Sequence, residues 1–297
     1  MKCDLHNHSI YSDGTFTPEE LVKEAERQNL SAIALTDHNT VMGLERFFAC
    51  GKNSKVKLVG GIEFSTDYKG TELHILGLFV SESEKNNIDS IVENALKLKE
   101  QSNIDVVNKI RDMGYDISYE EIKKSSPSGK INRANIASVM VKKNIVESVN
   151  RAFEKFLNPK LGLYHPPKKL SSLEIIDAIN NMGAVSVLAH PFLDLKTEEK
   201  LREFLDDAKI HHMDGMEVYY SKFSREQTEY AEKLADEYGL LKSGGSDFHG
   251  DNKPEISMGK GKDNLFIPYQ CYENLRKRYE EKNSKKQNNI SKKIGCI

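Results

Sequence analysis

Residues 31–36 read Ser-Ala-Ile-Ala-Leu-Thr, and Asp37 and His38 follow directly. A short apolar run without alternation is typical of a strand buried on both faces, as in a parallel sheet covered by helices. The residues before it favour a helix, because Thr17 can cap its start and Glu20 can complete a capping box. The pattern therefore predicts a strand that follows a helix and presents polar side chains at its carboxyl end.

The same alternation of strand and helix recurs along most of the chain. Capping residues and glycines mark the helices, for example Ser171 and Glu174 at the start of one helix and Gly183 at its end. Six or more such units favour an α/β barrel of parallel strands with helices outside. The strands are predicted at residues 2–7, 31–36, 56–62, 72–80, 184–189, 215–220 and 240–243.

The middle of the chain differs, because residues 88–157 show helix signals and no convincing strand. We therefore expect a barrel domain formed by residues 1–87 and 164–297, interrupted by a helical insertion at 88–163 that caps the substrate. Residues 282–293 are rich in lysine and asparagine. There we expect a solvated tail, with an RNA-binding arm as the alternative.

Composition limits the classes of protein to which the chain can belong. Its 297 residues, 38% of them hydrophobic, can form a substantial core, and a net charge of −2 provides no basic field for nucleic acid. No apolar stretch reaches the roughly 20 residues of a membrane span, and the first residues lack the apolar segment of a secretory signal. The four cysteines form no CxxC pair, which favours free thiols in a reducing compartment. We therefore expect a cytoplasmic globular protein.

Six of the nine histidines lie on or directly after predicted strands, and three carboxylates accompany them. Because the carboxyl ends of barrel strands meet at one face, we expect these side chains to converge. Imidazole and carboxylate without thiolate suit zinc, manganese or iron. Nine ligands exceed the roughly four to six positions of one ion, so we expect two or three divalent ions. The predicted ligands are His6, His8, Asp13, His38, Glu63, His74, His190, Asp247 and His249.

The predicted ligands lie within seven short motifs. These are Asp4-Leu5-His6-Asn7-His8-Ser9, Tyr11-Ser12-Asp13-Gly14, Thr36-Asp37-His38-Asn39, Gly61-Ile62-Glu63, Leu73-His74-Ile75-Leu76-Gly77, Ala189-His190-Pro191 and Gly245-Ser246-Asp247-Phe248-His249-Gly250. Taken together, the motifs resemble those of a known family, the PHP (polymerase and histidinol phosphatase) phosphoesterases; they occur in the family's order and span most of the chain. The resemblance implies a distorted seven-stranded βα barrel with a trinuclear metal site, and the insertion is similar to that of a subgroup that dephosphorylates nucleotides.

The resemblance also implies how the ligands are shared among the ions. Glu63 would bridge the first and second ions, and we take Glu63, Asp247 and His190 as catalytic candidates. A divalent metal lowers the pKa of bound water to about 7, so that hydroxide can attack phosphorus at neutral pH. Asp37 would help to orient the ligands. The implied groups are His6, His8, Glu63 and Asp247; Glu63, His74 and His190; and Asp13, His38 and His249.

Candidate substrate contacts lie outside these ligand motifs. The subgroup's Gly-Arg-Pro-His segment corresponds to Asn132-Arg133-Ala134-Asn135, so Arg133 is a candidate phosphate clamp and Asn135 stands where the subgroup has histidine. The alternative for Arg133 is a position on a helix surface. Other candidates could equally have structural or solvated roles; these are Tyr219, Tyr220, Lys168 and His165. The pair His211-His212 ends a predicted helix, and we expect a structural role for it.

These observations predict a metal-dependent phosphoesterase that hydrolyses phosphomonoesters, of nucleotides such as 5′-nucleoside monophosphates or 3′,5′-bisphosphates. The alternatives are a 5′-to-3′ exoribonuclease acting on short RNA, a histidinol-phosphate-type phosphatase, an amidohydrolase-like C–N hydrolase and a non-catalytic module. The set Asp13, His38 and His249 disfavours the amidohydrolase, and the complete set of ligands disfavours the non-catalytic module. We expect the partner to be a phosphate-bearing small molecule.

Overall fold

The computed structural model describes residues 1–51, 54–125, 131, 133–167, 169–262 and 264–294, without the side chains of 125 and 285–294. The chain divides into two compact units. Met1–Asp89 with Leu170–Ile297 form one unit, here called the barrel unit, and Ser90–Lys169 form the other, the helical unit. A role of the helical unit as a substrate cap stays a prediction.

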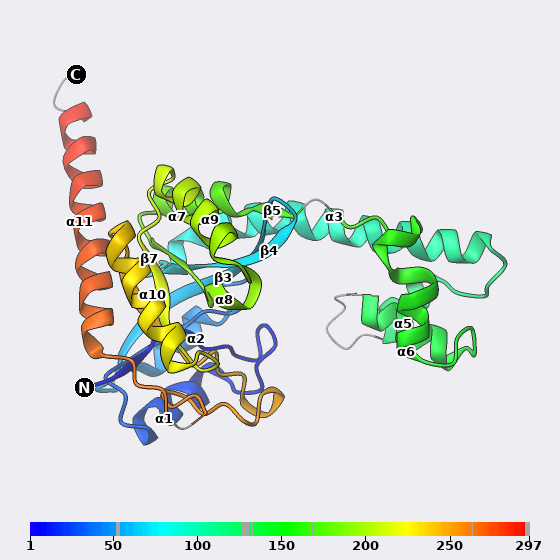
Figure 1. Ribbon diagram of the computed structural model, residues 1–297, viewed down its shortest axis with the longest axis horizontal. Coiled ribbons are helices and arrows are strands. Elements are labelled where there is room, and N and C mark those ends of the chain that lie inside the picture. Colours follow the sequence, from blue (N-terminus) through cyan, green and yellow to red (C-terminus); the bar gives the residue numbers. More distant parts are fainter. Residues whose placement is uncertain (52–53, 126–130, 132, 168, 263, 295–297) are drawn as a thin grey trace. The chain divides into compact units, whose positions relative to one another are not determined.

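The barrel unit is built around one sheet whose strands follow the order β1-β2-β3-β4-β6-β7-β8, with β5 pairing beside β3 (Figure 1). Its two edges are joined just after β1, where Leu5 N donates to Gly244 O (3.0 Å) and Asp247 N donates to His6 O (3.0 Å). The sheet is therefore a nearly closed barrel, and the predicted α/β barrel of seven strands is confirmed. The strands are β1 (Cys3–Asp4), β2 (Ala32–Leu35), β3 (Lys57–Tyr68), β4 (Thr71–Leu78), β5 (Leu170–Ser171), β6 (Val185–Leu188), β7 (Gly215–Tyr220) and β8 (Leu241–Gly245).

One strand departs from the predicted parallel arrangement. β4 runs antiparallel to both of its neighbours, β3 and β6. The reason is the connection from β3, which consists of Lys69 and Gly70 with φ of 49° and 82°. Two such left-handed residues form a tight hairpin, whereas a parallel partner needs a long crossover. As a result His74, in the first half of β4, lies opposite Ser65 in the second half of β3.

Helices cover the outside of the barrel, and the ends predicted at Thr17, Ser171 and Gly183 are confirmed. Thr17 forms a complete capping box, Ser171 accepts a hydrogen bond from Glu174 N, and Gly183 ends its helix in the left-handed conformation. Ser224 and Gly239 begin and end α10 in the same way. Among the described residues no helix is both long and apolar enough to cross a membrane. The covering helices are α1 (Pro18–Arg27), α2 (Leu44–Cys50), α7 (Ser172–Met182), α8 (Pro191–Asp194), α9 (Glu198–Ile210) and α10 (Arg225–Tyr238).

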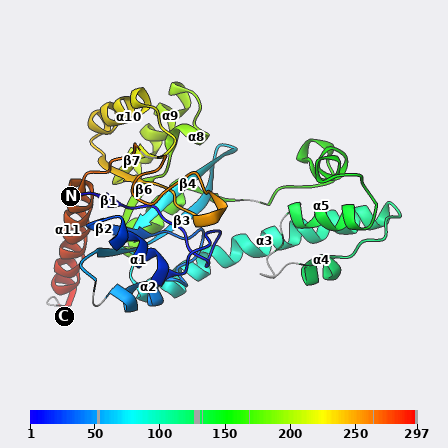
Figure 2. The ribbon, with the colours of Figure 1, turned by 90° about the horizontal axis from the view of Figure 1, so that it is seen from below.

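The C-terminal helix α11 (Tyr269–Ile294) packs against β1, β6 and β8, near the N-terminus (Figure 2). A face of apolar residues at helical spacing, including Cys271 and Leu275, packs into the core. Lys282, the first residue of the expected solvated tail, is partly buried: its Nζ lies 2.5 Å from Asp214 Oδ2 and also donates to Asn180 Oδ1 (2.7 Å). Solvation of the rest of that tail stays a prediction. The three described cysteines, Cys3, Cys50 and Cys271, are free thiols, as predicted.

The helical unit has its own hydrophobic core, which includes Val106, Ile110, Ile136 and Phe156. The described residues of this unit form helices and no strand, as predicted. Its elements are α3 (Lys85–Asp112), which begins in the barrel unit, α4 (Tyr119–Ser125), α5 (Arg133–Lys142), α6 (Val149–Ala152), η3 (Phe153–Leu157) and η4 (Pro159–Leu161); η2 (Glu82–Glu84) and η5 (Gly250–Asn252) are short turns of the barrel unit.

Candidate metal centre

Glu63, in the middle of β3, is the central residue of a buried cluster of histidines. Its Oε1 lies 2.8 Å from His74 Nδ1 and 3.0 Å from His190 Nε2. Its Oε2 faces a different set of rings. That oxygen lies 3.1 Å from each of His6 Nε2, His8 Nε2 and His38 Nδ1. The two carboxylate oxygens are thus divided between two groups of imidazoles, which is the arrangement expected of a bridging ligand.

His6 and His8 follow β1 and project to the same side of the extended chain, as their spacing predicts. Their Nε2 atoms are 3.1 Å apart. The backbone between them is held by Asn7, whose side-chain amide donates to Asp4 O and Ala34 O, each at 3.1 Å. The local sequence therefore fixes two imidazoles in the interior of the barrel, where both are fully buried.

Asp247 follows β8 and directs one carboxylate oxygen toward these imidazoles. Its Oδ1 lies 3.4 Å from His8 Nε2, while its Oδ2 accepts hydrogen bonds from Tyr220 Oη (2.8 Å) and Lys253 Nζ (2.7 Å). The residue has a left-handed φ of 58°. Such a backbone costs a non-glycine residue about 1–3 kcal/mol and is typical of functional sites. The hydrogen bonds to Oδ2 hold the side chain in this orientation.

A third group forms around Asp13, near the surface. Asp13 Oδ1 lies 3.2 Å from His249 Nε2 and 3.5 Å from His8 Nδ1, and Asp13 Oδ2 lies 3.8 Å from His38 Nε2. Asp37 holds the loop that leads to Asp13, because its carboxylate accepts hydrogen bonds from Ser9 and Ser12. Asp37 thus positions the loop that carries a predicted ligand and does not join the cluster itself.

The nine predicted ligands all belong to groups that could hold metal ions, with donor atoms within 4.8 Å of one another. The groups are His8, Asp13, His38 and His249; His6, Glu63 and His190; His6, His8 and Asp247; and His38, Glu63 and His74. They differ from the implied sets in that His74 and His190 fall into separate groups around Glu63, the first with His38 and the second with His6. In addition, His8 joins the group of Asp13, and Glu63 is absent from the group of His6, His8 and Asp247.

Two observations on the donor atoms fit a site for divalent cations. Glu63 Oε2, His38 Nδ1 and His190 Nδ1 are buried and make no hydrogen bond within the described part of the chain. In addition, the carboxylates attract positive charge. Burial opposes a charged imidazole, yet the adjacent carboxylates of Asp247 and Glu63 raise the pKa of His8 to about 9. Burial dominates at His38 and lowers its pKa to about 4, which leaves the neutral ring that a metal requires.

The sequence-based prediction missed Glu217, a buried residue of β7. Its Oε1 lies 3.1 Å from His6 Nδ1, and its Oε2 accepts a hydrogen bond from His190 N (2.8 Å). His190 itself has an unusual φ of 27°, which this hydrogen bond helps to maintain. The available signal was a carboxylate within the apolar stretch at 215–220, since an isolated charge is rarely buried without a partner.

The predicted substrate contacts that the structure describes are divided between the two units. Tyr219 points to the outer side of β7, where its hydroxyl donates to Glu232 Oε1 on α10 (2.5 Å); Tyr220 is the tyrosine that reaches Asp247. Arg133 lies in the helical unit, with its guanidinium 4.7 Å from the ring of Tyr164. Asn135 is half-buried in the same unit, His165 is exposed there, and Lys168 lies outside the described residues. His211 Nδ1 lies 2.8 Å from Asp177 Oδ2, in keeping with a structural role.

A cavity of about 180 Å³ opens onto the cluster. Glu63, His190 and Asp247, the three catalytic candidates, line it together with His38 and His74. Two further lining residues are cationic, Lys222 after β7 and Lys253 after η5. The cavity thus combines potential metal ligands with ammonium groups, a combination that suits a small anionic ligand.

Comparison with known proteins agrees with this geometry. Residues 4–161 match the model of the PHP domain family. The chain is 29% identical to a 5′-3′ exoribonuclease of Haemophilus influenzae, covering 84% of this chain and 90% of the relative. It is 26% identical to a 3′,5′-nucleoside bisphosphate phosphatase of Chromobacterium violaceum, covering 88% and 91%. A crystal structure of a proposed metal-dependent phosphoesterase from Bifidobacterium adolescentis is 26% identical, with a TM-score of 0.69, and covers 93% of this chain and 96% of that one.

The family match spans more than half of the chain, and it coincides with a barrel that gathers histidines and carboxylates around one cavity. The chain therefore belongs to the PHP domain family, and it is a metal-dependent phosphoesterase, a hydrolase of phosphate esters.

Proposed function

We propose that this enzyme hydrolyses phosphomonoesters of nucleotides, using two or three divalent ions held by the nine predicted ligands. The observation that carries the proposal is the position of Glu63, whose two oxygens each face a separate set of imidazoles at 2.8–3.1 Å. A carboxylate surrounded in this way can bridge two ions, and paired ions are well suited to phosphoryl transfer.

The residues fit divalent ions by number, type and burial. Imidazole nitrogens and carboxylate oxygens without thiolate suit manganese, iron or zinc. The three ligand groups implied by the family resemblance remain our assignment, with His8 lying close enough to Asp13 to join the third group. When bound, the ions supply an activated water near neutral pH and neutralise the charge of the phosphate.

The protein's own side chains bind and orient the substrate. Lys222 and Lys253 line the cavity and are placed to attract a phosphate dianion. Glu63, Asp247 and His190 are the catalytic candidates, because each is both a proposed ligand and a lining residue of that cavity. Tyr220 and Glu217 position them through hydrogen bonds to Asp247 and to His190 N. Catalysis would then depend on fixed charges and placement, without a covalent enzyme intermediate.

The nucleotide is proposed from the relatives together with the helical unit. The Chromobacterium violaceum relative is named as a nucleoside bisphosphate phosphatase, and the alignment extends over 88% of this chain. In this proposal the helical unit caps the substrate, Arg133 serves as a phosphate clamp, and Asn135, two residues further along α5, is a second contact. Lys168 remains a further proposed phosphate contact.

A substrate screen of the manganese-loaded, full-length protein tests the proposal. It should compare nucleoside 5′-monophosphates, 3′,5′-bisphosphates, histidinol phosphate and a peptide-like amide, with phosphate or amine release as the readout. We expect the highest kcat/KM for a nucleotide and no cleavage of the amide. Preferential turnover of histidinol phosphate would refute the nucleotide assignment.

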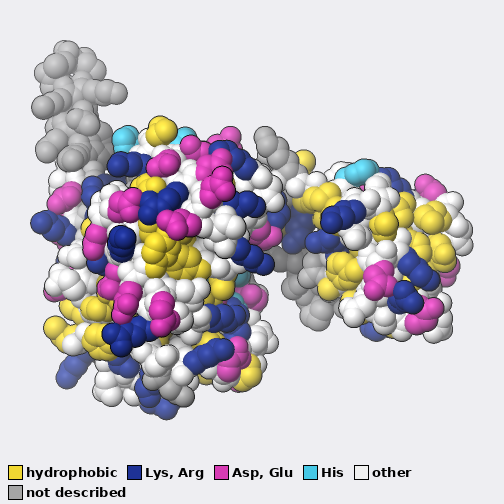
Figure 3. All heavy atoms as spheres, in the orientation of Figure 1, with side chains coloured by type: hydrophobic (Ala, Val, Ile, Leu, Met, Phe, Trp, Pro, Cys, Tyr) yellow, Lys and Arg dark blue, Asp and Glu magenta, His cyan; other side chains and the backbone are white. Residues whose placement is uncertain are grey.

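A second candidate is 5′-to-3′ removal of nucleotides from short RNA, favoured by the name of the Haemophilus influenzae relative. On the barrel-unit face visible in Figure 3, acidic and basic side chains intermingle and form no continuous basic surface. RNA binding through many phosphates would make affinity fall steeply with salt, by about one power per phosphate contact. Degradation of 5′-phosphorylated oligoribonucleotides, measured between low and moderate salt, separates the two candidates.

A further inference from the structure

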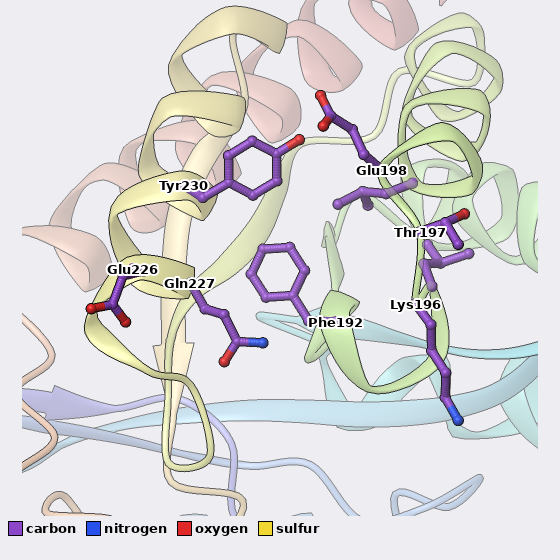
Figure 4. A pocket seen from close by; sticks show the side chains of 9 residues that line it. Phe192, Lys196, Thr197, Glu198, Glu226, Gln227 and Tyr230 are labelled. Atoms are coloured by element: carbon purple, nitrogen blue, oxygen red, sulfur yellow. The ribbon is translucent and has the colours of Figure 1, made fainter.

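A second cavity, of about 380 Å³, lies where α8, α9 and the start of α10 meet (Figure 4). Its volume falls within the roughly 300–1,000 Å³ of small-molecule sites. We infer that this cavity binds the base of the nucleotide whose phosphate lies at the metal centre. The inference rests on the proposed nucleotide function and adds to it a separate base-binding subsite. The residues that carry it are Phe192, Tyr230, Gln227, Glu198, Glu226 and Lys196.

The first argument is the shared wall between the two cavities. Leu193 and Asp194 of α8 line the cavity at the metal centre, whereas their neighbours Phe192 and Leu195 line this one. His190 directly precedes α8, so its Cα lies at most about 7.6 Å from that of Phe192, two peptide units away. The aromatic wall of the second cavity therefore begins two residues after a proposed metal ligand.

The second argument is a row of aromatic rings that connects the two places. The His190 imidazole lies 5.4 Å from the Tyr220 ring, and Tyr220 lies 5.1 Å from Phe223. Phe223 lies 4.8 Å from Phe192, and Phe192 is stacked 5.9 Å from Tyr230. Stacking on aromatic side chains is the usual way in which proteins hold an unpaired base of any sequence. The row leads from the proposed phosphate site directly into the cavity.

The third argument is the polarity of the cavity. The Gln227 Oε1 atom accepts a hydrogen bond from Ser224 N, while its amide nitrogen points into the cavity and has no hydrogen bond among the described residues. The carboxylates of the lining are engaged with their own neighbours: Glu198 pairs with the Arg202 guanidinium (2.9 Å), and Glu226 accepts a hydrogen bond from Ser224 Oγ (2.7 Å). The Gln227 amide can donate to a ring nitrogen or carbonyl oxygen of a base. A lining of aromatic rings and an amide fits a neutral, planar heterocycle.

A binding measurement tests the subsite without relying on catalysis. The chain contains no tryptophan, so Phe192→Trp introduces a single fluorescent reporter into the cavity. Titration of the manganese-loaded variant with adenosine, which carries no phosphate, should quench this fluorescence saturably. The matched control Phe266→Trp, at an exposed position, should show no saturable change. Absence of saturable quenching in Phe192→Trp, or equal quenching in the control, would overturn the inference.

A kinetic measurement separates this inference from the proposed function. We expect Phe192→Leu to lower the ratio of kcat/KM for AMP to that for ribose 5-phosphate by about 5- to 150-fold, the range typical of one stacked base. Phe266→Leu should leave the ratio unchanged. If the wild type cleaves AMP efficiently and Phe192→Leu keeps its ratio, the subsite alone is refuted. If the wild type cleaves ribose 5-phosphate but no nucleotide, the proposed function fails, and the adenosine titration still decides the subsite.

The base can belong to a mononucleotide or to the next residue of an RNA chain. Measuring the same kcat/KM ratio with a 5′-phosphorylated dinucleotide distinguishes these sources. If Phe192→Leu lowers the ratio for AMP, the cavity holds the base of the nucleotide that carries the phosphate. If it lowers only the ratio for the dinucleotide, the cavity holds the following base. No loss with either substrate overturns the inference.

Discussion

The Glu217 carboxylate lies 3.1 Å from His6 Nδ1, on the opposite side of the imidazole from Nε2, which lies 3.1 Å from Glu63. An acceptor at Nδ1 fixes the proton there and leaves the lone pair of Nε2 directed toward the cluster. The second oxygen of Glu217 accepts a hydrogen bond from His190 N (2.8 Å). One buried carboxylate thus sets the orientation of two proposed ligands.

Replacing Glu217 tests this orienting role. We expect Glu217→Gln to weaken metal affinity or activity by about 10- to 100-fold, because glutamine keeps the shape but can satisfy only one of the two contacts. Calorimetric titration with Mn²⁺ and kcat/KM on a nucleotide measure the effect. Glu232→Gln is a matched control, since Glu232 contacts Tyr219 on the outer side of the same strand. Wild-type manganese affinity in Glu217→Gln would exclude the orienting role.

Replacing Glu63, a proposed ligand, should have a larger effect than replacing Glu217, which only orients two ligands. Glu63→Gln removes the negative charge that faces five imidazoles and the second oxygen donor of a bridge. We expect activity to fall by more than the roughly 100-fold expected for a residue that only hydrogen-bonds to a ligand. We also expect the variant to lose more than one bound ion. Metal analysis after gel filtration and steady-state kinetics check this, with the exposed Glu229→Gln as control. Full metal content in the purified variant would contradict a bridging role.

Asp13 provides a selective test of the third ligand group. It is the most exposed proposed ligand, with 54% of its side chain accessible, and it contacts His249, His38 and His8. We expect Asp13→Asn to lose one equivalent of metal and to keep the ions around Glu63. Metal content measured by mass spectrometry reports the change in stoichiometry. A variant that loses all its metal, or none of it, would argue against a separate third group.

Removing the metal should destabilise the barrel unit. The carboxylates of Glu63 and Asp247 lie close together in a buried site, because both contact His6 and His8. Bound cations would balance their negative charge. A ligand at 100 times its Kd stabilises the folded state by about 2.7 kcal/mol for each site. We expect the melting temperature to fall after dialysis against a chelator and to recover with Mn²⁺. Recovery should be smaller in Glu63→Gln, and an unchanged melting temperature would contradict metal binding.

The ion pair between α11 and the barrel should contribute to stability. Lys282 Nζ contacts Asp214, Asn180 Oδ1 and Ala184 O, and Asp214 is 7% exposed. Lys282→Ala leaves Asp214 with hydrogen bonds from Ser186 and with the more distant Arg278 at 3.8 Å, so we expect a loss of about 1–3 kcal/mol in the free energy of unfolding. Urea denaturation measures it, with the exposed Lys277→Ala as control. A loss equal to that of the control would show that the contact is not stabilising.

Much of the architecture follows from local sequence patterns. Capping residues such as Thr17 and Ser224 and the C-terminal glycine Gly183 mark helix ends correctly, because each satisfies hydrogen bonds of its own helix. The direction of β4 does not follow from its apolar pattern. It depends on the Lys69-Gly70 turn, whose geometry was not used in the prediction.

The sequence by itself determined the types of ligand and their places on strands, since residue type and strand spacing are local properties. Only the tertiary structure decided how those residues meet: Glu63 between two sets of rings, Glu217 behind His6, and Tyr220 rather than Tyr219 at Asp247. The same holds for Lys282, the first residue of the expected tail, which pairs with Asp214. Contacts between residues far apart in the chain depend on strand register and on which face is buried, and neither can be predicted from one segment of sequence alone.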